Sequence, residues 1–347
     1  MQRPRLSIVV PVRDAAYGGA LVDRAQVCLD AFLTLAREHG LLCELVVVEW
    51  NPVEDAPRFR DLLHWPESLG PATLRFIEVP ATAHERQPEA HLRPFHSAAA
   101  RNVGVRRAEG EFILVTGADA LPNEELLAFL AHDKLFEHVF YRIDRRDLSE
   151  PVPVEWPLGR QLASAERQDV TVHTNYGSIH EPGDPSWRVR RRIRRRHEAI
   201  LREYTRFEAD PSHAMRKRAV GNDRLIFPAD RLHRNAAGDF FLMHRDRWHQ
   251  LRGYTELPTR GHTDSILCWT AASAGLAQVI LQPPLRLFHQ PHDREGVADW
   301  PVTDWRPWYE RYLECRRTGT ALIENTDAWG LHGETLPEWT FGGVPRQ

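Results

Sequence analysis

The sequence predicts an α/β protein with a mostly parallel central sheet flanked by helices. Short runs rich in Val, Ile and Leu alternate along the chain with longer segments whose apolar residues recur at helical spacing. These strand-like runs are apolar almost throughout, as expected for strands buried on both faces. Because alternation of strands with helices is typical of βαβ units, we expect most strands of the sheet to run parallel.

The first half of the chain shows this alternation most clearly. Residues 6–12 form a β-branched run, and residues 21–39 place apolar side chains at helical spacing before Gly40 ends the segment. Further strands are predicted at 44–49, 73–79 and 111–116, and helices at 98–108 and from about residue 122.

The second half is less regular. Residues 149–187 hold many Pro, Gly and Ser residues and little periodicity, which predicts an excursion or a flexible loop. Order returns with a strand at 238–243, helices at 245–252 and 264–274, and strands at 277–281 and 285–289. The stretch after residue 296 contains Trp300, Trp305, Trp308, Trp329 and Trp339. We expect it to be an arm packed on the body of the protein.

The composition excludes several classes of protein. Of the 347 residues, 42% are hydrophobic and 27% are charged, as in ordinary globular domains. The formal net charge of −3 gives no reason to expect nucleic acid as a partner. The four cysteines form no CxxC pair, and no apolar run approaches the roughly 20 residues that span a membrane. Because no signal-peptide pattern follows Met1, we expect a soluble cytoplasmic protein.

A strongly basic segment, Arg188 to Arg196, has seven arginines in nine positions. It could be a solvated loop or helix face, as dense blocks of like charge often are. It could also bind the phosphate or carboxylate groups of an acceptor, or attach the protein peripherally to anionic lipid of the inner membrane face. A nucleic-acid site fits least well, because no aromatic residues are interleaved with the arginines.

Candidate ligand-binding residues follow three of the predicted strands. Arg13, Glu49 and Asp119 each lie at or just beyond a strand end, which is where open α/β sheets bind ligands. A carboxylate there can accept a hydrogen bond from a ribose hydroxyl or hold a divalent cation. The sequence contains neither GxGxxG nor GxxxxGK[ST], so a nucleotide would need a metal, arginines or both to hold its phosphates.

Several segments, taken in their order and spacing, resemble a family-2-type glycosyltransferase with the GT-A fold, the fold of nucleotide-diphospho-sugar transferases. In the first half the resemblance rests on Ser7–Arg13, Glu44–Glu49, Ala100–Gly104, Ala108–Leu114 and Thr116–Pro122. In the second half it rests on Gly238–Phe241, Arg252–Tyr254, His262–Ser265 and Phe288–His289. It covers roughly residues 5–150 and 235–292.

The resemblance implies four regions. Residues 1–145 would form the nucleotide-sugar-binding half and residues 236–295 the acceptor-side half. Between them, residues 146–235 would be a variable insertion or loop region that carries the arginine run, and residues 296–347 would be the Trp-rich C-terminal arm.

The resemblance also implies a reaction and its residues. A hexosyl- or N-acetylhexosaminyltransferase would move a sugar from a nucleoside-diphosphate sugar, with UDP-sugar as the expected donor, to a saccharide, lipid-linked glycan, protein or small molecule. Asp264 would deprotonate this acceptor in an inverting transfer, while Asp119 and His289 would bind Mn²⁺ or Mg²⁺ at the leaving diphosphate. The remaining implied contacts are Pro11, Val12, Arg13, Glu49, Arg101 and Ala118 with the donor, and Gly238, Asp239 and His262 with substrate.

Two positions depart from the family pattern. Gly117 stands where the first carboxylate of the DxD motif is expected, and His262-Thr263-Asp264 stands where two adjacent acidic residues are commoner. Simpler roles are open as well, because Asp119 and Asp264 could each cap the helix that follows. His96 and His292 could contact phosphate or substrate, but a structural role is preferred for both.

Two other functions remain open at this point. A nucleotidyltransferase on a related sheet would need a Gly-rich first loop with a basic residue, which residues 13–19 imitate poorly. A catalytically degenerate sugar-nucleotide-binding protein would account for Gly117, whereas the presence of Asp119, Asp264 and His289 argues against it.

Overall fold

The computed structural model describes residues 3–13, 21–183, 186–207, 215–220, 223–228, 230–292 and 301–342. Residues 14–19, which belong to the loop compared above with a nucleotidyltransferase, lie outside this description, as does Trp300.

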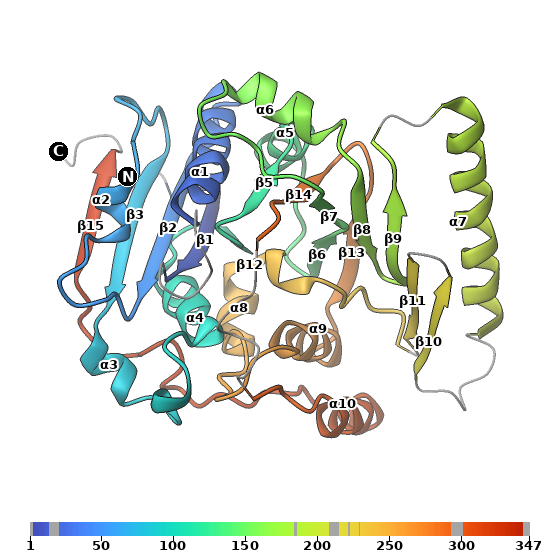
Figure 1. Cartoon of the computed structure of the whole chain (residues 1–347). Coiled ribbons are helices and arrows are strands. Elements are labelled where there is room, and N and C mark those ends of the chain that lie inside the picture. Colours follow the sequence, from blue (N-terminus) through green and yellow to red (C-terminus); the bar gives the residue numbers. More distant parts are fainter. Residues whose placement is uncertain are drawn as a thin grey trace.

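A large mixed sheet forms the centre of the molecule and has helices on both of its faces (Figure 1). The strand order is β13-β6-β12-β4-β1-β2-β3-β15. In this order the strands span Ala277–Leu281, Val139–Ile143, Phe240–His244, Phe112–Thr116, Leu6–Val12, Cys43–Trp50, Thr73–Val79 and Glu338–Gly342. The strands from β4 to β3 run parallel, whereas β12 and β15 are antiparallel to their neighbours. The α/β fold class with a central sheet flanked by helices is thus confirmed.

A second sheet adjoins the first and is antiparallel apart from one pair, β7 and β14. Its order is β10-β11-β9-β8-β7-β14-β5. In this order the strands span Met215–Val220, Asp223–Pro228, Gly177–Glu181, Val170–Thr174, Arg145–Leu148, Leu287–His289 and Ala120–Pro122. The chain passes from the first sheet to the second after β4 and again after β6, so the two sheets meet where these strands end.

The helices are α1 (Leu21–Glu38), α2 (Phe59–Leu62), α3 (Ala81–Glu85), α4 (Ser97–Arg107), α5 (Glu124–His132), α6 (Leu158–Ala165), α7 (Trp187–Phe207), α8 (Arg245–Leu251), α9 (Thr263–Ser273) and α10 (Arg306–Thr318), with 3-10 turns at Ala90–Leu92 and Ala237–Asp239. Two layers of helices cover the central sheet, with α1 and α5 in one core and α4, α8 and α9 in the other. Alternate residues of β1 belong to different cores: Ile8 packs in the core of α1 and α5, and Val9 in the core of α4, α8 and α9. This alternation is the ordinary two-residue period of a strand.

Helix α4 lies unusually close to the sheet, and Gly104 is the reason. A Cβ atom on Gly104 would lie 2.4 Å from Cγ1 of Val9 and 3.0 Å from Cγ2 of Val48. A side chain would therefore push the helix away from the strands. This packing keeps the start of α4, with Arg101, near the carboxyl ends of β1 and β4.

The strands and helices predicted outside residues 149–187 are present close to their expected bounds. Of the two alternatives for residues 149–187, the flexible loop is wrong, because the segment contains α6 and the hairpin β8–β9 of the second sheet. Val170, Val172 and Ile179 are buried in this hairpin, and their alternation outweighs the local content of Pro, Gly and Ser.

The basic run and the C-terminal arm both take regular structure. Residues Arg188 to Arg196 lie in α7, which stands at the edge of the molecule beside the second sheet (Figure 1). The arm packs on the body as expected, since α10 contacts α9 and β15 pairs with β3. Within the described ranges, no helix has the length and apolar character needed to cross a membrane.

Candidate functional site

Strand β14 brings together residues from three distant parts of the chain. It lies between β5 and β7, and its last residue, His289, is aligned with Ala120 on one side and Asp147 on the other. Asp119 immediately precedes Ala120, and its backbone carbonyl accepts a hydrogen bond of 3.0 Å from the amide of Gln290. The sheet register therefore fixes His289 beside two carboxylates.

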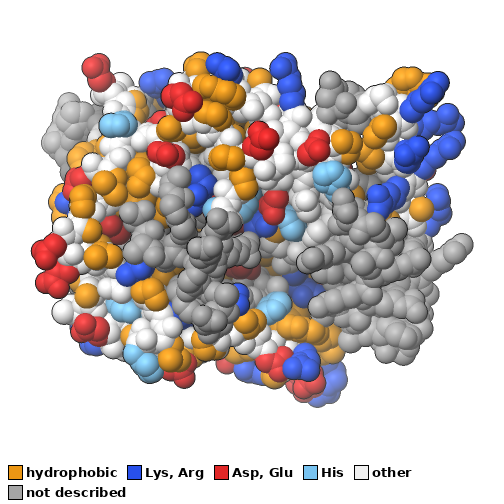
Figure 2. Space-filling model, viewed as in Figure 1, with side chains coloured by type: hydrophobic (Ala, Val, Ile, Leu, Met, Phe, Trp, Pro, Cys, Tyr) orange, Lys and Arg blue, Asp and Glu red, His pale blue; other side chains and the backbone are white. Residues whose placement is uncertain are grey.

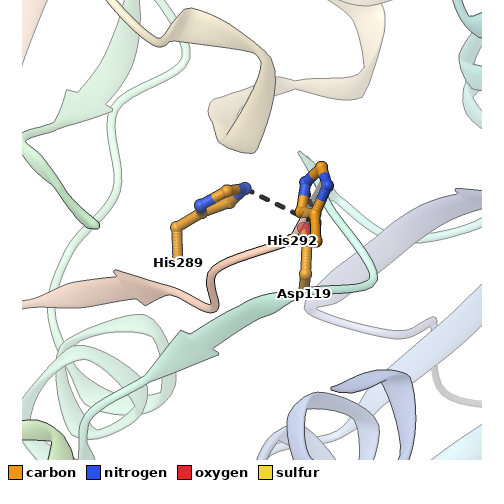
Figure 3. Close-up of side chains that lie close together, drawn as sticks. All are labelled: Asp119, His289 and His292. Carbon is orange, nitrogen blue, oxygen red and sulfur yellow. Dashed lines mark ion pairs between the residues drawn. The ribbon is translucent and has the colours of Figure 1, made fainter. Parts of the chain in front are cut away.

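Asp119, His289 and His292 form a cluster that could hold a metal ion (Figure 3). Oδ2 of Asp119 lies 3.4 Å from Nε2 of His289 and 3.2 Å from Nε2 of His292. One potential ligand atom from each residue lies within 4.8 Å of the other two. A carboxylate oxygen with two imidazole nitrogens is a donor set that suits a divalent transition ion, so the side chains fit the metal that the sequence implied.

The charges in this cluster are tightly coupled. Burial alone would raise the pKa of Asp119, but the two histidines outweigh it and hold that pKa well below its usual value. Burial likewise disfavours the protonated form of His289, yet Asp119 and Asp147 raise the pKa of His289 to about 10. The two carboxylates thus stabilise positive charge at this point, and the same negative groups would favour a bound cation in place of the imidazole proton.

The cluster opens into a cavity of about 570 Å³, a volume typical of small-ligand sites. Most of the residues predicted from the sequence line it: Pro11, Val12, Arg13, Arg101, Ala118, Asp119, Gly238, Asp239, Asp264 and His289. Five arginines, Arg13, Arg93, Arg101, Arg145 and Arg260, share the wall with these acidic residues. The cavity can therefore receive an anionic ligand next to a cation site.

Asp264 lies in the first turn of α9 and faces Arg101 across the cavity. Oδ1 of Asp264 is 2.6 Å from Nη1 of Arg101, and the Asp264 side chain is 23% exposed. The N-cap of α9 is His262 and that of α5 is Asn123, whose side chain accepts from the amide of Leu126. The alternatives in which Asp264 and Asp119 cap these helices are thus wrong, and the carboxylates pair with Arg101 and with the two histidines instead.

Gly117 leaves room for two acidic side chains. A Cβ atom at this position would lie 2.6 Å from Oδ1 of Asp119 and 3.3 Å from Oδ1 of Asp239. The other oxygen of Asp239, Oδ2, accepts a 2.5 Å hydrogen bond from Nη1 of Arg145. The space that a carboxylate at position 117 would need is therefore already used by Asp119 and bordered by Asp239.

Two predicted residues, Glu49 and His262, are not among the residues that line this cavity. The carboxylate of Glu49 is 5% exposed and accepts a 3.0 Å hydrogen bond from the amide of Phe59, at the start of α2. Burial raises the pKa of Glu49. His262 lies beside the lining residue Gly261 and has a left-handed backbone with φ of 58°.

The structure adds functional candidates that sequence reasoning missed. A structural role is the preferred prediction for His292, yet this residue joins the candidate metal cluster. Its spacing of three residues from His289 after a strand was an available signal. His96 does pack as a structural residue, stacked on Trp50 with ring centroids 6.0 Å apart. Asp147 and Arg145 lie on a short, charged strand that gave no periodic signal at all.

Comparison with known proteins gives limited additional information. Neither a protein-family model nor a curated protein sequence matches the chain. Among solved structures, similar chains include GalNAc-T7 with UDP, GalNAc and Mn²⁺, at a TM-score of 0.45 and 13% identity over 90% of this chain. This chain spans 48% of the GalNAc-T7 chain. TarS of S. aureus in complex with UDP-GlcNAc gives a TM-score of 0.43 and 13% identity over 92% of this chain and 68% of TarS. At such scores the likeness assigns no role to any residue.

Proposed function

We propose that this protein is a GT-A-type glycosyltransferase that moves a sugar from a nucleoside-diphosphate sugar, with UDP-sugar as the expected donor. The observation that carries the proposal is the opening of the Asp119–His289–His292 cluster into the same cavity as Asp264 and Arg101. A cation site, cationic side chains and a carboxylate then surround one volume, as transfer from a diphosphate leaving group requires.

The donor would lie with its diphosphate at the metal cluster. Asp119, His289 and His292 would hold the ion, and two imidazole ligands favour Mn²⁺ over Mg²⁺, which prefers oxygen. When bound, the ion neutralises the negative charge that develops on the leaving diphosphate. Arg13 and Arg101 line the same cavity and would contact the phosphates or the nucleoside, since guanidinium groups suit phosphate oxygens.

Asp264 would act as the base for the acceptor. The carboxylate takes the proton from an acceptor O–H or N–H, the acceptor atom bonds to the anomeric carbon, and the bond from that carbon to the diphosphate oxygen breaks. Its electron pair leaves with the nucleoside diphosphate, and the anomeric configuration inverts. In the structure Asp264 pairs with Arg101 at 2.6 Å, so Arg101 would have to share its charge with the donor phosphates before Asp264 can accept the proton.

Ligand-dependent thermal unfolding tests the donor and metal assignment. UDP with Mn²⁺ should stabilise the protein by about 2.7 kcal/mol at 100 times the dissociation constant. UDP alone, and ADP or CMP with Mn²⁺, should stabilise it less. Absence of stabilisation by any nucleoside diphosphate would overturn the proposal.

A pair of variants tests the base. Asp264→Asn should keep the shift produced by UDP and Mn²⁺ but lose on the order of 10²–10⁴-fold in turnover of the donor sugar. Asp327→Asn removes an exposed carboxylate that pairs with Arg252 at 2.8 Å, and serves as the matched control that should change neither quantity. Binding of UDP without turnover by the wild type would instead favour a sugar-nucleotide-binding protein.

We propose in addition that α7 makes peripheral contact with an anionic membrane surface. Its exposed arginines gather at one edge of the molecule (Figure 2) and comprise Arg188, Arg191, Arg192, Arg194, Arg195 and Arg202. Ile200 is buried on the other face, whereas Trp187, at the start of the helix, is 67% exposed. Arginines beside an exposed tryptophan are typical of segments that lie at a lipid interface.

Vesicle sedimentation tests this contact. The protein should bind vesicles that contain phosphatidylglycerol more than vesicles of phosphatidylcholine alone, and added salt should weaken the binding. Replacing Arg191, Arg192 and Arg195 with Gln should reduce binding by about 100-fold, at roughly 1 kcal/mol per basic residue. Equal binding to both kinds of vesicle would contradict the proposal.

A further inference from the structure

Asp147 lies behind the metal cluster, on the far side of the His289 ring. Nδ1 of His289 is 3.3 Å from Oδ1 of Asp147, whereas Nε2 faces Oδ2 of Asp119 at 3.4 Å. The imidazole thus spans two carboxylates, one of which borders the ion site and one of which lies behind it. A histidine that binds a metal through one nitrogen usually donates its other N–H to a carboxylate, which fixes the ring and its tautomer.

We propose that Asp147 is a positioning residue that orients His289 through Nδ1 and leaves Nε2 free to bind a divalent cation. This inference rests on the metal site of the proposed function. The alignment of His289 with Asp147 in the β14–β7 ladder supports it, because adjacent residues of neighbouring strands keep a fixed separation. Sheet geometry therefore holds the carboxylate in place whether or not an ion is present.

Asp147 is itself held on several sides. Nε of Arg145 lies 2.7 Å from Oδ1, and Nη2 of Arg145 donates to Oδ2 at 2.9 Å. Nε2 of His173, on the neighbouring strand β8, is 2.8 Å from Oδ2, and Oγ of Ser178 on β9 is 2.9 Å from Nδ1 of the same histidine. Three adjacent strands thus contribute to the position of one carboxylate. A solvated surface aspartate would not need so many contacts.

The charge of Asp147 is suited to this role. Arg145 and His173 both pair with this carboxylate, at 2.7 and 2.8 Å. Oδ1 of Asp147 lies 3.3 Å from Nδ1 of His289, so the carboxylate faces this ring nitrogen. An ionised acceptor strengthens the basicity of the opposite ring nitrogen, the one that faces Asp119.

The same strand offers a matched control. Arg146 follows Arg145 on β7 and points to the opposite face of the sheet, where Nη2 lies 2.6 Å from Oε2 of Glu181. This ion pair lines a separate cavity and does not reach the metal cluster. Glu181→Gln therefore removes a carboxylate that is paired with an arginine of the same strand, without touching His289.

The test is a titration of the full-length protein with Mn²⁺ in the absence of donor, with free Mn²⁺ followed by its electron paramagnetic resonance signal. Asp147→Asn should weaken Mn²⁺ binding by 10- to 100-fold, while Glu181→Gln should bind Mn²⁺ as the wild type does. His173→Gln removes a partner of Asp147 without altering His289, and should weaken binding by a smaller factor. It also serves as the second variant if Asp147→Asn does not fold, which circular dichroism would reveal.

The outcomes separate this inference from the proposed function. Wild-type protein that binds no Mn²⁺ would overturn the metal site and, with it, the role of Asp147. Wild-type protein that binds Mn²⁺, with folded variants at Asp147 and His173 that bind it equally well, would overturn the positioning role alone. Weaker binding in Glu181→Gln to the same degree as in Asp147→Asn would also overturn it, because the effect would then come from general loosening of the sheet.

Discussion

A carboxylate at position 117 should weaken the candidate metal site, although it would restore the DxD pattern. The Cβ atom of any residue there would lie 2.6 Å from Oδ1 of Asp119, whereas ordinary contacts begin at 3.4 Å. Asp119 must then move by nearly 1 Å, and misplacement of about 1 Å at a reacting centre costs on the order of 100-fold in rate. In Gly117→Asp a further negative charge beside Asp119 and Asp239 adds repulsion.

Mn²⁺ titration and donor turnover measure this effect. We expect Gly117→Asp to bind Mn²⁺ at least 10-fold more weakly than the wild type and to turn over donor about 100-fold more slowly, with Gly117→Ala in between. Gly159→Asp is the matched control, because a Cβ atom on Gly159 meets nothing within 4 Å. Tighter Mn²⁺ binding by Gly117→Asp would refute the reasoning and would show that this chain has simply lost a ligand.

Three further predictions concern stability. In Gly104→Ala the new methyl group meets Val9 at 2.4 Å, so urea unfolding should show a loss of about 1–3 kcal/mol despite the better helix propensity of alanine, and a gain would contradict the packing argument. Burial and the charge of Arg93 lower the pKa of His96 to about 3. As pH falls below about 6.5, the His96 imidazole is therefore protonated in the unfolded chain but not yet in the folded one. Stability should then fall by up to about 1.4 kcal/mol per pH unit between pH 6.5 and 3, and His96→Gln should flatten that slope; an unchanged slope would exclude this role for His96. Arg142 is fully buried and donates to three backbone carbonyls, one of them that of Ala237 at 3.0 Å. Thermal unfolding of Arg142→Met should therefore show a free energy of unfolding lower by about 3 kcal/mol. A loss below about 1 kcal/mol would contradict this.

The strands of the first half were predictable because their apolar runs are buried on both faces. Residues 43–50 of β2, for example, are all buried, and the sequence there is almost wholly apolar. β7 could not be found in this way. It carries Arg145 and Asp147, which are tolerated in the interior because they pair with each other and with His173 and Asp239. His173 lies on β8 and Asp239 in the 3-10 turn Ala237–Asp239, so no local pattern marks the segment.

The candidate site, like the fold, was predictable in part. Asp119 and His289 follow recognisable strands, so their arrival at one sheet edge could be expected from topology alone. The contact between His289 and Asp147 depends on the pairing of β14 with β7, two strands far apart in the chain that are short and have no hydrophobic alternation in common. Glu49 fulfils the positional rule equally well, yet its carboxylate turns toward the amide of Phe59, a choice that only the local packing decides.

Strand β15 completes the central sheet, and it is the last strand of the sheet to be synthesised. It covers the edge of β3, where Arg75 donates to Glu338 at 2.7 Å across 263 residues, and Arg60 stacks on Trp339 at 3.7 Å. While the ribosome is still making residues 236–295, the edge of β3 has no partner in β15. An unpaired edge with apolar neighbours is a template for aggregation. We therefore expect the newly made chain to depend on chaperones that shield β3 until β15 has left the ribosome, and soluble yield to rise when translation is slowed by cooling.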